Sequence, residues 1–240
     1  MKKAGMKKGK NKEFSTPYTV TNAVAKGNII TKLSLLIMGL GNIAHKQIGK
    51  GIMFLAVEAA YIWYMIQSGI YNLSMLPSLG WREQEKVWNE KKSIYEYTAG
   101  DQSALILLYG VATVYITAMF IIVWRESVKS SYKSEVLAKS GKHLNNFKED
   151  CKSLLDQNLY KLLLAAPVMG ILIFTILPLI YNITMAFTNY SKVNDHLVLF
   201  DWVGLANFKK ILNFGDSIGK QFYSVLGWTL IWAIVATALN

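Results

Sequence analysis

LLLAAPVMGILIFTILPLIYNITMAF, residues Leu162–Phe187, is a run of 26 residues without a charged side chain. As an α-helix it would extend about 39 Å, whereas the hydrocarbon core of a bilayer is about 30 Å thick. Its Leu, Ile, Phe and Val side chains favour insertion by roughly 4 to 8 kcal/mol. A buried helix of a soluble protein is the alternative, but the length and the absence of charge favour a membrane-spanning helix.

The composition of the 240 residues agrees with a membrane protein. Hydrophobic residues make up 52% of the chain and charged residues 17%, and the apolar residues stand in blocks with the charges between them. A soluble domain would interleave the two at the period of a helix or strand. The net charge of +11 comes from basic residues that flank the apolar blocks, without the basic groove that polynucleotide binding requires. We therefore expect contact with membrane lipid and no nucleic-acid partner.

Three further segments are predicted to cross the membrane: Gly49–Ile70, Ala104–Trp124, and the stretch from Phe222 to the end of the chain. Ala104–Trp124 carries no charge. Gly49–Ile70 is a weaker candidate because it contains Glu58, and a carboxylate at the centre of a span costs about 2.5 to 3.5 kcal/mol. Glu58 is either a polar residue that pairs with a neighbouring helix, which we favour, or a functional group.

Ile29–Ile43 is apolar but too short to span, and it carries Lys32. We expect an amphipathic helix on the membrane surface. A signal peptide is the alternative, but the following GNIAHKQ, residues 41–47, has no small-residue cleavage pattern.

The distribution of lysine and arginine predicts the orientation. With the N-terminus in the cytoplasm, 18 basic residues face the cytoplasm and 8 face outward, which follows the positive-inside rule. The expected fold class is all-α: a polytopic membrane protein with about four transmembrane helices, an amphipathic N-terminal surface helix and short soluble loops. The predicted regions are a basic cytoplasmic N-terminus with the interfacial helix (1–48), two transmembrane helices (49–125) with an extracellular loop (71–103), a cytoplasmic linker (126–161), and two further helices (162–240) with an extracellular loop (189–221).

The sequence lacks the motifs of common enzymes. GDSIGK, residues Gly215–Lys220, has one residue too few between its glycines for a phosphate-binding loop. His45, His143 and His196 stand far apart, and no metal or nucleophile motif includes them. The single Cys151 excludes an intrachain disulfide. We expect neither an enzyme nor a cofactor or metal site.

Several segments together resemble the MalF-type permease subunit of bacterial carbohydrate ABC importers. The resemblance begins at KLSLLIMGLGNIAHKQIGKGIMFLAVEAAYI (32–62), the pair Gly100 and Asp101, and NNFKEDCKSLLDQNLYK (145–161). It continues through AAPVMGILIFTILPLIYNITMAFTNYS (165–191), FDWVGLANFKKIL (200–212) and FYSVLGWTLIWAIVATALN (222–240). The order of these sequence segments and their spacing around the spans make the resemblance specific.

The resemblance implies a transport subunit of the bacterial plasma membrane. Its expected partners are a second, MalG-like permease subunit, cytoplasmic ATPase subunits that hydrolyse ATP, and an extracellular lipid-anchored sugar-binding protein. The expected cargo is a maltose- or maltodextrin-like oligosaccharide, with a galacto-oligosaccharide nearly as well supported.

Residues 189–221 are then expected to face the binding protein. Asp201, Trp202, Asn207 and Phe208 are the candidate contacts. For the two aromatic residues, an interfacial aromatic belt is the favoured alternative.

Pro178 lies well inside the third span. It removes the amide that would bond the Phe174 carbonyl, so it should bend the helix. We favour a structural role for this kink over a gating role.

The family's coupling loop for the ATPase, with its EAA sequence, has no counterpart before Asn240. Glu58, Ala59 and Ala60 spell these letters, but they lie inside the first span and lack the downstream glycine. We therefore expect an interrupted reading frame or a fragment, truncated on the C-terminal side. An independent four-span scaffold or assembly protein is the alternative function, and a small channel is disfavoured because the spans lack rings of charge.

Overall fold

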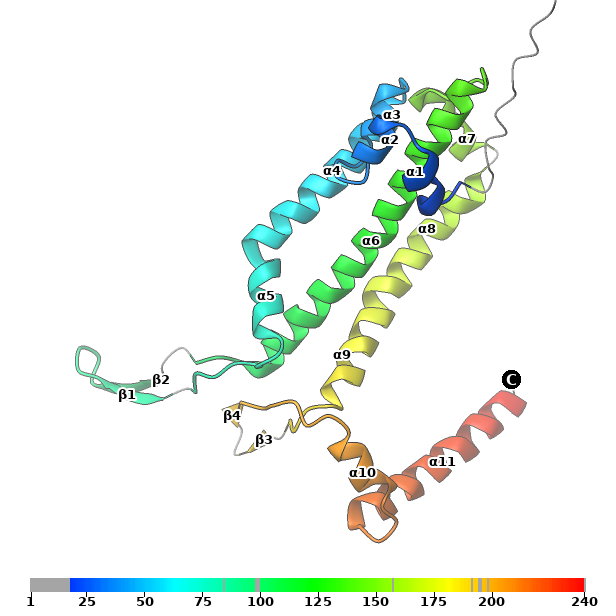
Figure 1. Cartoon of the computed structure of the whole chain (residues 1–240). Coiled ribbons are helices and arrows are strands. Elements are labelled where there is room, and N and C mark those ends of the chain that lie inside the picture. The colour runs from blue at the N-terminus through cyan, green and yellow to red at the C-terminus, as the bar shows by residue number, and fades with distance from the viewer. Residues whose placement is uncertain are drawn as a thin grey trace, which may run out of the picture. The chain divides into compact units, whose positions relative to one another are not determined.

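The computed structural model describes residues 18–83, 85–97, 100–156, 158–190, 192–193, 196–197 and 199–239. Residues 1–17 of the predicted basic N-terminal region (1–48) lie outside this part. Figure 1 shows the order of the elements along the chain. The helices are α1 (Val20–Lys26), α2 (Ile29–Leu33), α3 (Leu40–Ala44), α4 (Ile48–Tyr64), α5 (Ile70–Met75), α6 (Ser103–Lys139), α7 (Phe147–Leu155), α8 (Leu159–Ile171), α9 (Leu177–Met185), α10 (Ala206–Leu212) and α11 (Ser217–Leu239).

Two π-helical turns and four short strands complete the described structure. The π-helical turn η1 (Met65–Gly69) joins α4 to α5, and η2 (Leu172–Ile176) joins α8 to α9. The strands β1 (Lys86–Asn89) and β2 (Ile94–Tyr97) form an antiparallel hairpin, and β3 (Lys192–Val193) pairs antiparallel with β4 (His196–Leu197). In the first hairpin Trp88 pairs with Tyr95.

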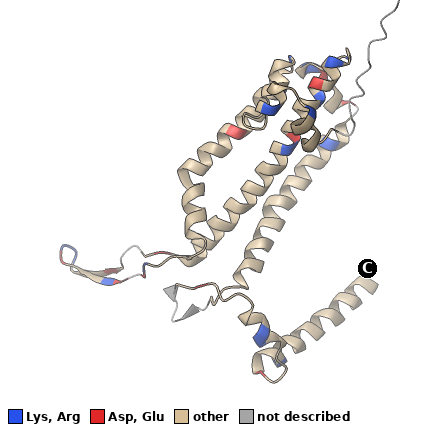
Figure 2. Ribbon diagram, in the orientation of Figure 1, with Lys and Arg blue, Asp and Glu red and all other residues tan. Residues whose placement is uncertain are grey.

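Four helical runs of the described chain are long and apolar enough to cross a bilayer: Ile48–Met75, Ser103–Lys139, Leu159–Met185 and Ser217–Leu239. The prediction of an all-α polytopic membrane protein is therefore confirmed. Leu163 and Phe174 in the third run are 66% and 81% exposed, as expected of side chains that face lipid. In Figure 2, no charged residue interrupts this run beyond the start of α8.

The chain divides into two compact units that cut across the helices. The first unit contains residues 1–66 and 116–167, and the second contains 67–115 and 168–240. The first unit holds the segments predicted to be cytoplasmic, and the second holds those predicted to be extracellular. The topology itself stays a prediction.

The segment 29–43 differs from the single helix predicted for it. It forms α2 and α3, separated by turns and a bend at residues 34–39. Gly39 has a φ of +78°, a left-handed conformation that favours glycine. A Cβ at Gly39 would overlap the carbonyl oxygen of Gly51 in α4. The prediction of one continuous helix was therefore wrong, because this tight turn and close contact outweigh the apolar pattern.

In the first unit, the N-terminal segment packs against the second half of α6 through buried polar groups. Asn42 is fully buried, and its side-chain Nδ2 donates to Gln47 Oε1 and to Ser130 Oγ, both at 2.9 Å. Ser131 Oγ donates to Asn42 Oδ1 at 3.0 Å. The hydroxyl-rich face of α6 thus gives the polar groups of α3 hydrogen-bond partners, as burial requires. These contacts also explain why α6 continues past its predicted end at Trp124.

The second unit has an apolar core of its own. It contains Leu79, Leu107, Val111 and Phe200, all buried. The amide of Phe200 donates to Ser103 Oγ at 3.2 Å. The chain after α9 is thereby fixed to the start of α6.

Candidate functional site

The segment that follows α9 contains all four predicted contact residues, and it is a folded structure. Thr188 and Trp202 form an antiparallel bridge. On one side of it, the Asn189 amide donates to the Asp201 carbonyl at 3.0 Å, and the Asp201 amide donates to Asn189 Oδ1 at 2.6 Å. On the other side, the Val203 amide donates to the Phe187 carbonyl at 2.8 Å. The two stretches around residues 188 and 202 are therefore held side by side.

Asn207 fastens α10 to the end of α9. Its Nδ2 donates to the carbonyl of Ala186 at 2.9 Å and to that of Thr188 at 2.7 Å. The last carbonyls of a helix have no partner within the helix. The Asn207 side chain therefore satisfies the one at the C-cap Ala186 and also binds the Thr188 carbonyl in the segment that follows. Next to this contact, the rings of Phe208 and Phe187 lie 5.1 Å apart between centroids.

The neighbouring residues Trp202 and Asp201 differ in the contacts of their side chains. Trp202 Nε1 donates to the Leu76 carbonyl, at the end of α5, at 2.9 Å, and its side chain is partly exposed. Asp201 is exposed, and within the described residues only its backbone forms hydrogen bonds. Of the four predicted contacts, three therefore have internal roles, whereas the Asp201 carboxylate is open to a partner.

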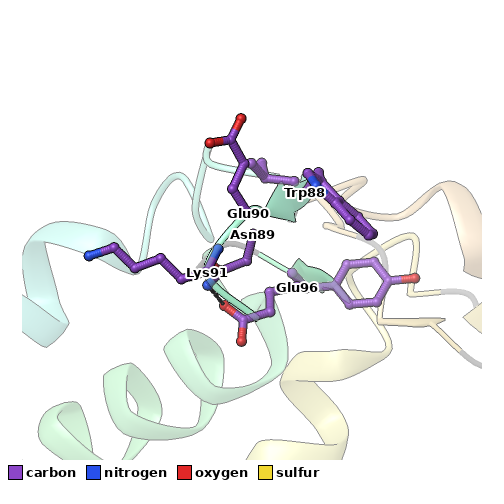
Figure 3. A pocket seen from close by; sticks show the side chains of 7 residues that line it. Trp88, Asn89, Glu90, Lys91 and Glu96 are labelled. Atoms are coloured by element: carbon purple, nitrogen blue, oxygen red, sulfur yellow. Dashed lines mark hydrogen bonds between the residues drawn. The ribbon is translucent and has the colours of Figure 1, made fainter. Parts of the chain in front are cut away.

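The β1–β2 hairpin presents a second exposed surface in the same unit. Trp88 and Tyr95 pack edge to face across the strands, with ring centroids 4.9 Å apart, and both are about half exposed. Asn89 Nδ2 donates to Glu96 Oε2 at 2.8 Å, and Lys92 pairs with Glu96 at 2.7 Å. Trp88, Asn89 and Glu96 line a hollow of about 440 Å³ together with Glu90 and Lys91. Figure 3 shows these five side chains. Because a two-stranded hairpin buries little of its own surface, the aromatic pair lies open to contact.

Asp101 anchors the base of that hairpin, a role the sequence reasoning missed. Its Oδ2 accepts from the amides of Trp81 and Arg82, both at 3.1 Å. These backbone hydrogen bonds, supported by the Arg82 guanidinium, hold the pKa of the Asp101 carboxyl below its ordinary value. Gly80, at φ +103°, leaves room for the carboxylate, since a Cβ there would lie 2.7 Å from Asp101 Cβ. An aspartate just before a helix that starts at Ser103 was the available signal.

We expect Asp101→Asn to loosen the base of the hairpin at neutral pH. The amides of Trp81 and Arg82 should exchange with solvent several-fold faster, because a neutral oxygen accepts these bonds more weakly than a carboxylate. Hydrogen exchange with mass spectrometry measures the change, and the backbone amides of α10 serve as an internal reference.

The same contact predicts a pH dependence. A carboxyl whose pKa is lowered by folding stabilises the folded state at any pH above its pKa in the unfolded chain, which is about 3.9 for aspartate. This stabilisation is lost as the pH falls through the lower pKa of the folded state. Protection of the two amides should therefore fall in strongly acidic solution in the native chain, whereas it should stay constant over that range in Asp101→Asn. Equal acid dependence of both chains would contradict the assignment.

Glu58, the charged residue of the first predicted span, has a hydrogen-bond partner in the structure. Glu58, half-buried in α4, accepts from the amide of the buried Met38 at 2.8 Å. Its partner is thus the turn between α2 and α3, where we expected a neighbouring helix.

Pro178 is the second residue of α9, directly after η2. In η2 the Leu172 carbonyl accepts from the Leu177 amide and also from Tyr115 Oη at 3.1 Å. The widened turn accommodates the proline, and the predicted kink stays a prediction.

The histidines whose side chains are described have local partners. His45 Nδ1 lies 2.6 Å from the Gly41 carbonyl oxygen, and His143 Nε2 lies 2.9 Å from Glu149 Oε2. Within the described residues, His, Cys, Asp and Glu side chains form no cluster of three that could hold a metal ion.

Comparison with known proteins finds transport permeases. The chain is 29% identical over 227 residues to the maltodextrin transport system permease protein MdxF of Bacillus subtilis, covering 93% of this chain and 47% of that protein. It is 29% identical over 209 residues to the maltodextrin permease protein MalC of Streptococcus pneumoniae, with 85% and 44% covered. It is 26% identical over 218 residues to the galactooligosaccharides permease protein GanP of Bacillus subtilis, with 88% and 47% covered.

These findings confirm the resemblance to carbohydrate-transport permeases. The chain spans about half the length of the curated relatives it matches. No family model matches the chain, and no solved structure matches it. The relatives are transport subunits by name, and none of them supports the alternative of an independent scaffold.

Proposed function

We propose that this chain acts as a membrane-spanning permease subunit of an ABC-type sugar importer in the bacterial plasma membrane, with its N-terminus in the cytoplasm. The observation that carries the proposal is the alignment of 93% of the chain with a maltodextrin permease. The four apolar helical runs support it. They supply part of the wall of a pathway through the bilayer.

The proposed cargo is an oligosaccharide of the maltodextrin type. Two of the relatives described above carry maltodextrin in their names and one carries galactooligosaccharides, so a soluble sugar chain is the shared chemistry. In this proposal, cytoplasmic ATPase subunits supply the energy, a second permease subunit completes the pathway, and an extracellular lipid-anchored binding protein delivers the sugar. The resemblance and the names of the relatives support these partners.

The proposed docking side for the binding protein is the second unit. Its bridged segments around residues 188 and 202 form an ordered platform, from which the Asp201 carboxylate is exposed. The internal hydrogen bonds of Trp202 and Asn207 hold that platform in shape. We therefore assign Asp201 to direct contact, and Trp202, Asn207 and Phe208 to its support.

Co-purification from the native membrane tests this function. An affinity-tagged permease that carries this segment together with the family's coupling loop should recover an ABC-type ATPase, a second permease and a sugar-binding protein, identified by mass spectrometry. Recovery of none of the three would contradict the importer role.

The Asp201→Lys variant tests the docking assignment separately. It should recover several-fold less binding protein and the same amount of ATPase, because the charge reversal affects an outward-facing carboxylate only. Glu83→Lys makes the same change at an exposed acidic residue of the other predicted extracellular loop and should recover both partners normally. If both variants behaved alike, Asp201 would not be a specific contact.

A further inference from the structure

A groove of about 640 Å³ lies in the first unit, between α4, α6, α7 and the start of α8. Six of its twelve lining residues have large apolar side chains: Met53, Phe54, Val57, Val123, Phe147 and Leu154. The volume is in the range of small-molecule sites. Figure 1 shows the four helices that contribute to it.

The groove is shaped by the close packing of α7 on α4. A Cβ at Gly49 would lie 2.6 Å from the ring of Phe147, so the glycine lets the aromatic ring rest directly on the backbone. At the start of α7, Asn146 and Glu149 form a capping box, which fixes the helix end. The position of α7, and with it the groove, is therefore determined by local contacts.

Two lysines give the groove a cationic rim. Lys50, near the start of α4, and Lys161, near the start of α8, both line it. Within the described residues neither forms a salt bridge, and Lys161 lies 5.7 Å from the ring centroid of Tyr160. Asp150 is the acidic residue of the lining, and its Oδ1 accepts from Asn145 Nδ2 at 3.3 Å. Two positive charges and one negative charge leave the rim net positive.

We propose that this groove binds an anionic glycerophospholipid of the surrounding bilayer. The acyl chain lies on the apolar floor, and the headgroup phosphate lies between the ammonium groups of Lys50 and Lys161. Lipid is the occupant that the position favours, because both lysines stand where apolar spans begin, the level at which headgroups lie. Basic pockets between membrane helices bind anionic headgroups by charge complementarity.

The single cysteine of the chain provides a probe within the groove. Cys151 lines it and is partly exposed, so a bound lipid should shield its thiol from alkylation. The full chain in mixed micelles would be treated with iodoacetamide, with phosphatidylglycerol or phosphatidylcholine of identical acyl chains at equal mole fraction. We expect phosphatidylglycerol to slow alkylation at least fivefold more than phosphatidylcholine.

Two double variants test whether the lysines of the rim cause the difference in alkylation between the two lipids. Lys50→Gln/Lys161→Gln should abolish the difference between the two lipids, and each single variant should reduce it. Lys148→Gln/Lys152→Gln removes the same charge from exposed positions of α7 that do not line the groove and should keep the difference. Loss of the difference in both double variants would show diffuse attraction to the basic surface and would overturn the proposal.

A displaced thiol controls for the effect of an anionic surface on thiol reactivity. In Lys148→Cys/Cys151→Ser the only thiol lies on the exposed side of α7, so the lipids should affect its alkylation alike. Equal protection of both thiol positions would overturn the proposal, as would equal protection by both lipids. Protection that rises with protein concentration in lipid-free micelles would assign the groove to a second copy of the chain and would also overturn it.

Discussion

Replacing Glu135 by alanine is expected to release the N-terminal segment from α6. The Glu135 carboxylate is 1% exposed and accepts from the Thr31 hydroxyl at 2.6 Å and from the Asn28 amide at 3.0 and 3.1 Å. Lys139 also pairs with it. Alanine would leave the buried Thr31 hydroxyl and the partly buried Asn28 amide without this acceptor. Each hydrogen bond to a charged group contributes about 1.5 to 3 kcal/mol.

The loss should therefore amount to about 2 to 4 kcal/mol of local stability. Exchange of the backbone amides in the peptide that contains Asn28 and Thr31 should accelerate by about 30- to 700-fold. Glu135→Gln keeps an acceptor of the same shape and should cost less. Glu126→Ala breaks an exposed pair with Lys129, whose Nζ lies 2.6 Å from Oε1, and it should change exchange little. If Glu135→Ala and Glu126→Ala gave similar exchange, the anchoring role would be wrong.

The predictable part of the fold is the part that depends on length and charge. The uncharged run Leu162–Phe187 agrees with a helical run at Leu159–Met185, and the weaker segment with Glu58 also forms a helix. The differences lie at the helix ends. Most residues after Trp124 are polar. There α6 packs against the N-terminal segment through their side-chain hydrogen bonds and through the buried Val128, Tyr132 and Val136.

Those partners stand about 90 to 107 residues away in the sequence. Ser127 Oγ, for example, accepts from the Gly39 amide at 3.0 Å. No local period marks such a pair, so sequence reasoning did not find the polar contact surface of α6.

The candidate contact site stays a prediction, and the structure shows internal contacts for three of its four residues. Trp202 and Asn207 stand out in a short loop, yet their hydrogen bonds close that loop on Leu76 and Thr188. Side-chain type alone does not separate a residue that holds a platform from one that touches a partner. The exposed Asp201 carboxylate becomes distinct only when the contacts of its neighbours are known.

The second large effect is expected at the contact of Gly39 with Gly51. Gly39→Ala would combine two costs, since its φ is +78° and its new Cβ would overlap the Gly51 carbonyl oxygen. A left-handed conformation costs an alanine about 1 to 2 kcal/mol, and overpacking costs about 1 to 3 kcal/mol. We expect a loss of about 2 to 5 kcal/mol, with separation of α3 from α4 and faster proteolysis at Lys46.

Two matched glycines separate these costs. Gly141 has a φ of +64°, and a Cβ added there would meet nothing within 4 Å, so Gly141→Ala measures the backbone cost alone. Gly51 has no left-handed conformation, but a Cβ there would overlap Ile43 Cγ1, so Gly51→Ala measures the contact cost alone. Thermal unfolding in detergent should rank Gly39→Ala as the most destabilising of the three, because only it carries both costs. A Gly39→Ala chain no less stable than Gly141→Ala would show that α3 can move away from α4 freely, and the glycine contact would then not hold the N-terminal segment in place.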